Sequence, residues 1–351
     1  MNKLKIGYWP LSPDLKSAGD RRRLVFWAHA RGHDIVTDLK QKVDVIVASE
    51  NSDYNSPYLA NNNTPIIFDL VDAYLSPLNP IDDLARGFAK RLSGQISGAV
   101  KPFSHHVRDF CKVSKAVICS SSEQEEVIRN FNINTHIILD SHDEIPFMVP
   151  QNFKPKVDEP HRILWEGQPA TIRGVGQISS ILTQLSKVID LQIDFVTDEK
   201  YFHLLNRYFE RETLSLLKQD LAQIVDFIGI VPWSPTNLVN SAKQSTLAII
   251  PIDLSVPMQR LKPENRLLIM WRLGLPCLTS PSPAYMRVAK EAGVAAVCFS
   301  SQDWLEKINL LLSDSIYAKN EILNGQNYLR ENHNRNSLLN KWDTAFESVM
   351  G

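Results

Sequence analysis

The sequence has no long hydrophobic run. Its 351 residues contain no stretch of about 18 consecutive apolar residues, which is roughly what a membrane-spanning helix requires. The N-terminal segment passes directly into a strand pattern and lacks the apolar core and cleavage site of a signal peptide. The sequence therefore predicts neither a membrane span nor a secretory leader.

An excess of charge of one sign is also absent. The 38 basic and 39 acidic residues leave a formal net charge of -1, so binding to nucleic acid by bulk electrostatics is not expected. Arg21, Arg22 and Arg23, together with Lys101, form a local basic group that could contact anionic lipid. No amphipathic anchor accompanies this group, so contact with a membrane surface is not favoured over solvated surface.

The cysteines show no ligand-like or disulfide-like spacing. Cys111, Cys119, Cys277 and Cys298 are scattered among apolar neighbours, as expected of reduced core thiols. No Asp-x-Asp triplet occurs, and no metal site is expected. We expect a cytoplasmic protein, with the inner face of a membrane as the alternative location.

The chain alternates short apolar strands with helical segments, and the alternation restarts at Arg162. This order predicts an α/β fold with two Rossmann-like domains, residues 1–150 and 151–330, meeting at a proline-rich linker, Pro146 to Pro160. Strands are predicted at Lys5–Trp9, His33–Thr37, Val43–Ala48, Pro65–Leu70, Ala116–Cys119, Thr135–Leu139, Arg162–Trp165, Leu191–Val196, Val225–Ile228 and Leu247–Ile250. The longest predicted helical stretches are Ile81–Val113, Tyr201–Ala222 and Ile316–Gly351.

One stretch, Lys262 to Tyr285, organises the second half. A buried strand precedes it, Asn265 to Leu273 has the apolar face of a helix, and Gly274 is placed to end that helix. Lys262, Asn265 and Arg266 lie where the helix dipole favours an anion, so a phosphate is the natural ligand. The alternative is a solvated helix start whose basic residues bind nothing.

Two features of the first half also follow predicted strands. Gly19 would let a backbone approach a ligand closely, although many strand-to-helix turns contain glycine. Asp69 and Asp72 end a strand, where α/β proteins place reacting groups. Asp72 is a candidate to orient or deprotonate a hydroxyl, and capping of a turn is the competing interpretation.

Five segments, in matching order over nearly the whole chain, resemble GT-B-fold glycosyltransferases. The resemblance is closest to the retaining group that includes sucrose and glycogen synthases and bacterial polysaccharide transferases, the glycosyl transferases of group 1. The segments are Ala18 to Ile35, Val117 to Gln124, Trp165 to Gly174, Phe227 to Pro232, and Asn265 to Pro276 with its Leu273-Gly274-Leu275-Pro276.

This resemblance implies two Rossmann-like domains facing across a cleft. The first domain would bind the acceptor and be completed by a C-terminal helix, about residues 331–351, and the second would bind the donor. The activity would move a sugar from a nucleotide-diphosphate sugar to a hydroxyl of a saccharide or lipid-linked glycan. Polysaccharide, glycolipid or glycoconjugate synthesis, retention of configuration and independence of metal are implied in the same way, with no cofactor besides the donor.

The expected catalytic residues are Asp72 at the acceptor and Arg173 and Arg266 at the donor diphosphate, because a fixed guanidinium fork grips phosphates well. Gly19 is expected in the acceptor cleft. The remaining donor contacts implied are Gly167, Thr171, Val231, Lys262, Glu264 and Asn265.

The sequence departs from the resembled group at one place. That group often carries two glutamates with seven residues between them, and the corresponding positions here are Leu261 and Ile269. Glu264 is a nearby substitute for one of them. The departure leaves two alternatives open, a catalytically silent GT-B partner or scaffold protein and a nucleotide-sugar epimerase. The sugar, the base, the acceptor, the stereochemistry and the oligomeric state stay open.

Overall fold

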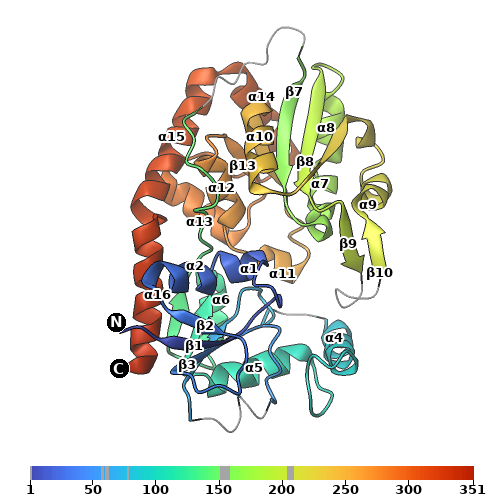
Figure 1. Cartoon of the computed structure of the whole chain (residues 1–351). Helices are drawn as coiled ribbons and strands as arrows, with labels where there is room; N and C mark the ends of the chain where they lie inside the picture. The colour runs from blue at the N-terminus through green and yellow to red at the C-terminus, as the bar shows by residue number, and fades with distance from the viewer. Residues whose placement is uncertain (1, 57–58, 60–62, 77–78, 151–158, 204–208) are drawn as a thin grey trace. The chain divides into compact units, whose positions relative to one another are not determined.

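The computed structural model describes residues 2–56, 59, 63–76, 79–150, 159–203 and 209–351. The chain divides into two compact units, shown with their elements in Figure 1. Unit 1 consists of Met1–His142, Leu261–Pro263 and Asn334–Gly351. Unit 2 consists of Asp143–Arg260 and Glu264–His333.

Unit 1 contains a parallel sheet with the strand order β2-β1-β3-β4-β5-β6. Its strands are almost wholly apolar, as expected where helices cover both faces of a sheet. Their bounds are β1 Lys5–Trp9, β2 Asp34–Val36, β3 Val45–Ser49, β4 Ile66–Asp69, β5 Ala116–Cys119 and β6 Thr135–Ile137. The order of the strands reverses between β1 and β3, the position where ligands bind in open α/β sheets.

Two hydrophobic clusters cover the two faces of this sheet. Val45 and Val47 of β3 point into the cluster that contains Trp27 and Phe346, whose rings stack with centroids 4.1 Å apart. Ile46, the residue between them, points into the opposite cluster. The helices of unit 1 are α1 Ala18–Arg21, α2 Leu24–Arg31, α4 Pro80–Leu92, α5 Phe103–Val113, α6 Ser122–Ile128 and α16 Arg335–Met350.

Unit 2 contains a second parallel sheet, with the strand order β11-β8-β7-β12-β13. Counted from β7, this is the 3-2-1-4-5 order of a Rossmann sheet, and the order reverses between β7 and β12. The strands are β7 His161–Glu166, β8 Leu191–Thr197, β11 Ile228–Pro232, β12 Leu247–Ile250 and β13 Cys277–Thr279. A separate antiparallel pair is formed by β9 Lys200–His203 and β10 Phe209–Glu212.

Helices of unit 2 fill the crossovers between these strands. The short ones are η1 Pro169–Thr171, α7 Arg173–Gly176, α8 Ser179–Leu185, α9 Thr213–Asp220, η2 Val225–Phe227 and α11 Pro257–Arg260. The others are α10 Pro235–Gln244, α12 Asn265–Arg272, α13 Pro283–Ala292, α14 Ser301–Ser313 and α15 Ser315–Asn332.

Helix α12 forms where the apolar pattern predicts it and buries the five residues from Leu267 to Trp271. It ends because Gly274 adopts a left-handed conformation with φ 71°, which few other residues tolerate. The amide of Leu275 then donates to the carbonyl of Met270 at 3.0 Å and closes the helix end.

Several sequence predictions differ from the structure. The strand predicted at Val225–Ile228 is found at Ile228–Pro232, because Val225–Phe227 form the 3-10 helix η2. The helical stretch predicted over Ile81–Val113 is interrupted between Leu92 and Phe103.

The helix predicted over Tyr201–Ala222 is wrong in its first part, because that part contains the β9-β10 pair, and only α9 is helical. The division between the units follows His142 rather than residue 150. The reason is that Met148 donates its amide to Arg272 in unit 2 at 2.8 Å. Most of the predicted linker, residues 151–158, lies outside the described residues.

Candidate functional site

In unit 2, the loop that follows β7 lies at the switch point of the sheet, the position between β7 and β12 where the strand order reverses. A Cβ on Gly174, in the first turn of α7, would lie 2.2 Å from the carbonyl oxygen of Pro251, which follows β12. Only a glycine allows this approach of backbone to backbone. The loop from Gly167 to Gly174 is therefore held against the ends of both β7 and β12.

Arg266, at the start of α12, reaches this loop. Its Nη1 donates to the carbonyl oxygen of Glu166 at 2.9 Å. A Cβ on Gly167 would lie 2.8 Å from Nη1 of Arg266 and 2.9 Å from Oγ1 of Thr171. Three residues that the sequence proposed for donor binding, Gly167, Thr171 and Arg266, thus meet at the switch point, where a cation and a helix N-terminus together favour an anion.

Other proposed donor residues in unit 2 lie apart from this cluster or are already engaged. The side chain of Arg173 is 66% exposed, and its Nε lies 3.4 Å from Oδ2 of Asp220. Val231 lies on β11, half-buried, opposite Val196 of β8. Buried Glu264 faces Nη1 of Arg287 at 3.4 Å.

Asn265 and Lys262 have distinct environments. The Oδ1 atom of Asn265, the first residue of α12, is buried and has no hydrogen-bond partner among the described residues. Lys262 is grouped with unit 1, where its Nζ lies 3.9 Å from Oδ1 of Asp72.

Glu166 is a candidate that sequence reasoning did not single out. The residue is 7% exposed, and its Oε1 accepts a hydrogen bond from Nε1 of Trp233 at 3.0 Å. The second oxygen, Oε2, is buried and has no hydrogen-bond partner in the described part of the chain. An unsatisfied buried carboxylate oxygen is costly, so it is suited to accept hydrogen bonds from a ligand. The signal in the sequence that could have identified Glu166 is a charged residue at the end of an apolar strand.

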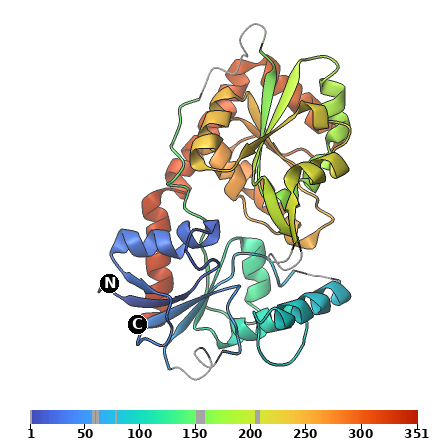
Figure 2. The same cartoon turned by 45° about the vertical axis from the view of Figure 1, so that its right-hand side comes forward.

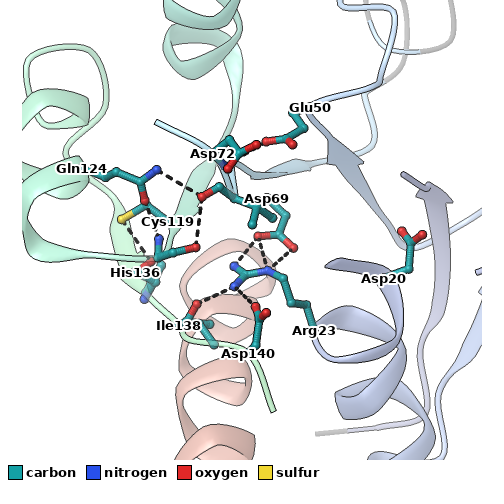
Figure 3. A network of polar contacts seen from close by, with 12 residues as sticks. Asp20, Arg23, Glu50, Asp69, Asp72, Cys119, Gln124, His136, Ile138 and Asp140 are labelled. Carbon is teal, nitrogen blue, oxygen red and sulfur yellow. Dashed lines mark hydrogen bonds and ion pairs between the residues drawn. The ribbon is translucent and has the colours of Figure 1, made fainter. Parts of the chain in front are cut away.

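Unit 1 contains a buried ion-pair network below its switch point (Figure 3). The Arg23 side chain is fully buried, and its Nη2 and Nε donate to Asp69 at 2.6 and 3.0 Å. Its Nη1 donates to the carbonyl oxygen of Ile138 at 2.7 Å and lies 3.3 Å from Asp140. Because Arg22 is also buried, the basic surface expected from residues 21–23 does not exist. Asp69 has a structural role as well, because its carboxylate accepts the hydrogen bonds of Arg23.

The loop after β1 is held by Asp20. This buried carboxylate accepts hydrogen bonds from the hydroxyl of Tyr8 at 2.6 Å and from the amides of Leu11 and Ser12 at 2.8 and 2.9 Å. A Cβ on Gly19 would lie 2.3 Å from Cδ1 of Leu11. Leu11 therefore packs directly on Gly19, and the role of Gly19 at an acceptor stays a prediction.

A pair of carboxylates lies at the switch point of unit 1. Glu50 follows β3, and its buried Oε2 accepts a hydrogen bond from the amide of Asp72 at 3.0 Å. Figure 3 shows the two side chains adjacent to one another. Burial, and then the charge of Asp72, raise the pKa of Glu50 to about 8. Asp72 itself keeps 34% of its side chain exposed, beside Lys262.

The raised pKa favours the protonated form of Glu50 at neutral pH, because burial penalises its charged form. Glu50 was not proposed from the sequence, where a polar residue ending a strand is equally typical of a solvated loop. Asp72 was proposed, and the structure leaves it accessible.

The described residues contain no group of three or more His, Cys, Asp or Glu side chains arranged to hold a metal ion. The four cysteines are buried and free. Within the described ranges, no helix has the length and apolar character needed to cross a bilayer.

No protein-family model and no curated protein sequence matches the chain. Solved structures do match it, and they establish that the chain has the GT-B fold, with two Rossmann-like units. HepE from Anabaena, solved with UDP-glucose, has a TM-score of 0.63 at 11% identity, covering 99% of this chain and 100% of that one.

Two further structures show the same fold. WaaG, a glycosyltransferase involved in lipopolysaccharide biosynthesis, has a TM-score of 0.56 at 14% identity, covering 99% of this chain and 100% of that one. TarM from S. aureus has a TM-score of 0.59 at 9% identity over 86% of this chain. This chain spans only 54% of the length of TarM.

Proposed function

We propose that this protein is a glycosyltransferase that moves a sugar from a nucleotide-diphosphate sugar to an acceptor hydroxyl. The observation that carries the proposal is the placement of Arg266 against the Gly167 loop, at the switch point of a Rossmann sheet. The GT-B fold supports it, since HepE of this fold was solved with UDP-glucose and with UDP and glucose.

The leaving group of such a reaction is a nucleoside diphosphate, so catalysis depends on stabilising developing negative charge. Arg266 and the first amides of α12 supply that stabilisation in this proposal. Arg266 lies at the end of β7 with its guanidinium fixed by the Glu166 carbonyl, so little reorganisation is needed. Lys262 and Arg173 are assigned as further cations for the phosphates, and Gly167, Thr171, Val231, Glu264 and Asn265 as donor contacts.

Acceptor chemistry is assigned to unit 1. In the proposal, Asp72 orients or deprotonates the acceptor hydroxyl, and Glu50 fixes the Asp72 backbone by accepting a hydrogen bond from its amide. Asp72 is the better candidate for proton transfer because it is partly exposed, while Glu50 is buried.

The finer assignments belong to the same proposal. We assign retention of configuration, independence of metal, and a role in polysaccharide, glycolipid or glycoconjugate synthesis. A cytoplasmic location is supported by four free, buried thiols. The acceptor is a saccharide or a lipid-linked glycan.

Binding of nucleoside diphosphates tests the proposal. A panel of UDP, GDP, ADP and dTDP is titrated against the full chain by calorimetry, and at least one is expected to bind. The Arg266→Ala variant should lose about 1.5–3 kcal/mol of binding free energy, the usual contribution of a hydrogen bond to a charged group. Arg129→Ala, which changes the exposed arginine at the C-terminal cap of α6, is the matched control and should bind as the wild type does.

One observation favours a second candidate, a catalytically silent GT-B partner protein. Ile269, at one of the expected glutamate positions, is 1% exposed within α12, so that position offers no carboxylate to a donor. Absence of binding to every member of the panel would support the silent protein and contradict the transferase.

A further inference from the structure

Helix α4 of unit 1 carries an apolar stripe on its outward face. Ile81, Leu84, Phe88 and Leu92 follow one another at spacings of three, four and four residues, which place them on one side of a helix. These side chains are 75%, 46%, 50% and 71% exposed. Figure 2 shows α4 beside α5 at the outer edge of unit 1. An ordinary surface helix has the opposite orientation, with its apolar face inward.

The polar groups of α4 point inward and fix this orientation. Asp83 accepts hydrogen bonds from the amide and hydroxyl of Ser104, on α5, at 3.0 and 2.5 Å. Nζ of Lys90, a buried residue, lies 4.5 Å from the ring centroid of Phe103. A Cβ on Gly87 would lie 2.0 Å from the Lys101 carbonyl oxygen, so the helix packs too closely to rotate.

The surroundings of the stripe are basic. Residues 80–113, which comprise α4, α5 and their connection, contain six Lys or Arg and three Asp, a formal charge of +3. The whole chain carries -1. Arg91 and Lys112 are exposed members of this group. The segment that carries the stripe is thus net positive, although α4 also has one exposed acidic residue, Asp82, next to Ile81.

We propose that the α4 stripe docks on an anionic lipid bilayer, lying in the interface rather than crossing it. From Ile81 to Leu92 the stripe is about 16 Å long and one side chain wide. A stable protein interface buries roughly 800 Å² per partner, more than four side chains in a single row supply. Insertion of a narrow apolar row on a segment of net positive charge is instead the geometry of interfacial helices on anionic membranes.

Vesicle flotation of the full chain tests this docking. Vesicles of phosphatidylcholine alone are compared with vesicles that also contain about 30% phosphatidylglycerol. The wild type is expected to float with the anionic vesicles and to partition less to the neutral ones. Joint substitution Phe88→Ser and Leu92→Ser should lower partition to the anionic vesicles by at least about tenfold, because two apolar side chains no longer insert.

A matched control uses two apolar residues of unit 2 that are at least as exposed, Val188→Ser and Ile316→Ser, which should leave partition unchanged. Wild-type protein that ignores anionic vesicles, or an α4 variant that floats as well as the wild type, would overturn the proposal. Light scattering that shows a wild-type dimer and a monomeric α4 variant would assign the stripe to a second copy and also overturn it. Nucleoside-diphosphate binding by the α4 variant should match the wild type, so this test is separate from the test of transferase activity.

Discussion

A Cβ atom on Gly167 would lie 2.8 Å from Nη1 of Arg266, although the two residues are 99 positions apart in the sequence. Gly167 therefore defines where the guanidinium rests. A side chain at position 167 would require the guanidinium of Arg266 or the hydroxyl of Thr171 to move.

Gly167→Ala is expected to displace Arg266 and to weaken nucleoside-diphosphate binding about as much as Arg266→Ala does. Since both changes remove the same interaction, the double variant should be little worse than either single one. Calorimetry on the wild type, the two single variants and the double variant gives a double-mutant cycle. Gly176→Ala is the control, because a Cβ there has no neighbour closer than 3.7 Å. Full additivity of the two changes would show that Gly167 and Arg266 act independently.

Glu166→Gln tests the unsatisfied carboxylate oxygen. The variant keeps an oxygen that can accept from Trp233, but it replaces the charged acceptor that a ligand hydroxyl would meet. We expect affinity for a nucleoside diphosphate to fall by about 1.5–3 kcal/mol, the range for hydrogen bonds to charged groups. Affinity for inorganic pyrophosphate should not change, because it carries no sugar hydroxyl. Equal losses for the two ligands would assign Glu166 to the phosphates or to folding.

The sequence predicts the two sheets because their strands are continuous apolar runs, of which β3 and β12 are examples. It also predicts α12 and its end at Gly274, where local pattern and local conformation agree. The β9-β10 pair was missed because each strand has only four residues and is rich in charged and polar ones, so no apolar run marks it in the sequence.

The candidate site was predictable only in part. Arg266 stands out because a basic residue at a helix start has a local physical meaning. Glu50 and Glu166 are functional candidates because they are buried, and burial depends on neighbours distant in the sequence. The outward orientation of the α4 stripe could not be predicted from the sequence for the same reason. Its amphipathic pattern is local, but the bond from Ser104 to Asp83 decides which face turns inward.

Glu50 makes the stability of unit 1 depend on pH. Its pKa is raised to about 8 by burial and by Asp72, so between its ordinary pKa and about 8 the folded state holds a proton that the unfolded state has lost. Folding stability should therefore fall as pH rises through this window. Glu50→Gln removes the titration, and its stability relative to the wild type should increase from about pH 5 to about pH 9 in urea unfolding. Parallel stability curves for the two proteins would contradict a raised pKa.

The Asp72→Asn variant tests the acceptor chemistry. Asparagine keeps the shape of the side chain, its capping ability and the amide that donates to Glu50, but it cannot take a proton from a hydroxyl. Turnover on a verified acceptor is expected to fall by about 10²-fold or more, while donor affinity measured by calorimetry stays unchanged. The pKa of Glu50 should fall at the same time, because one of the charges that raise it is gone. Glu50→Gln, which removes the neighbouring carboxyl group and leaves Asp72 intact, is the control and should retain most of the turnover. If Asp72→Asn keeps wild-type turnover, Asp72 has a structural role and the proton acceptor lies elsewhere.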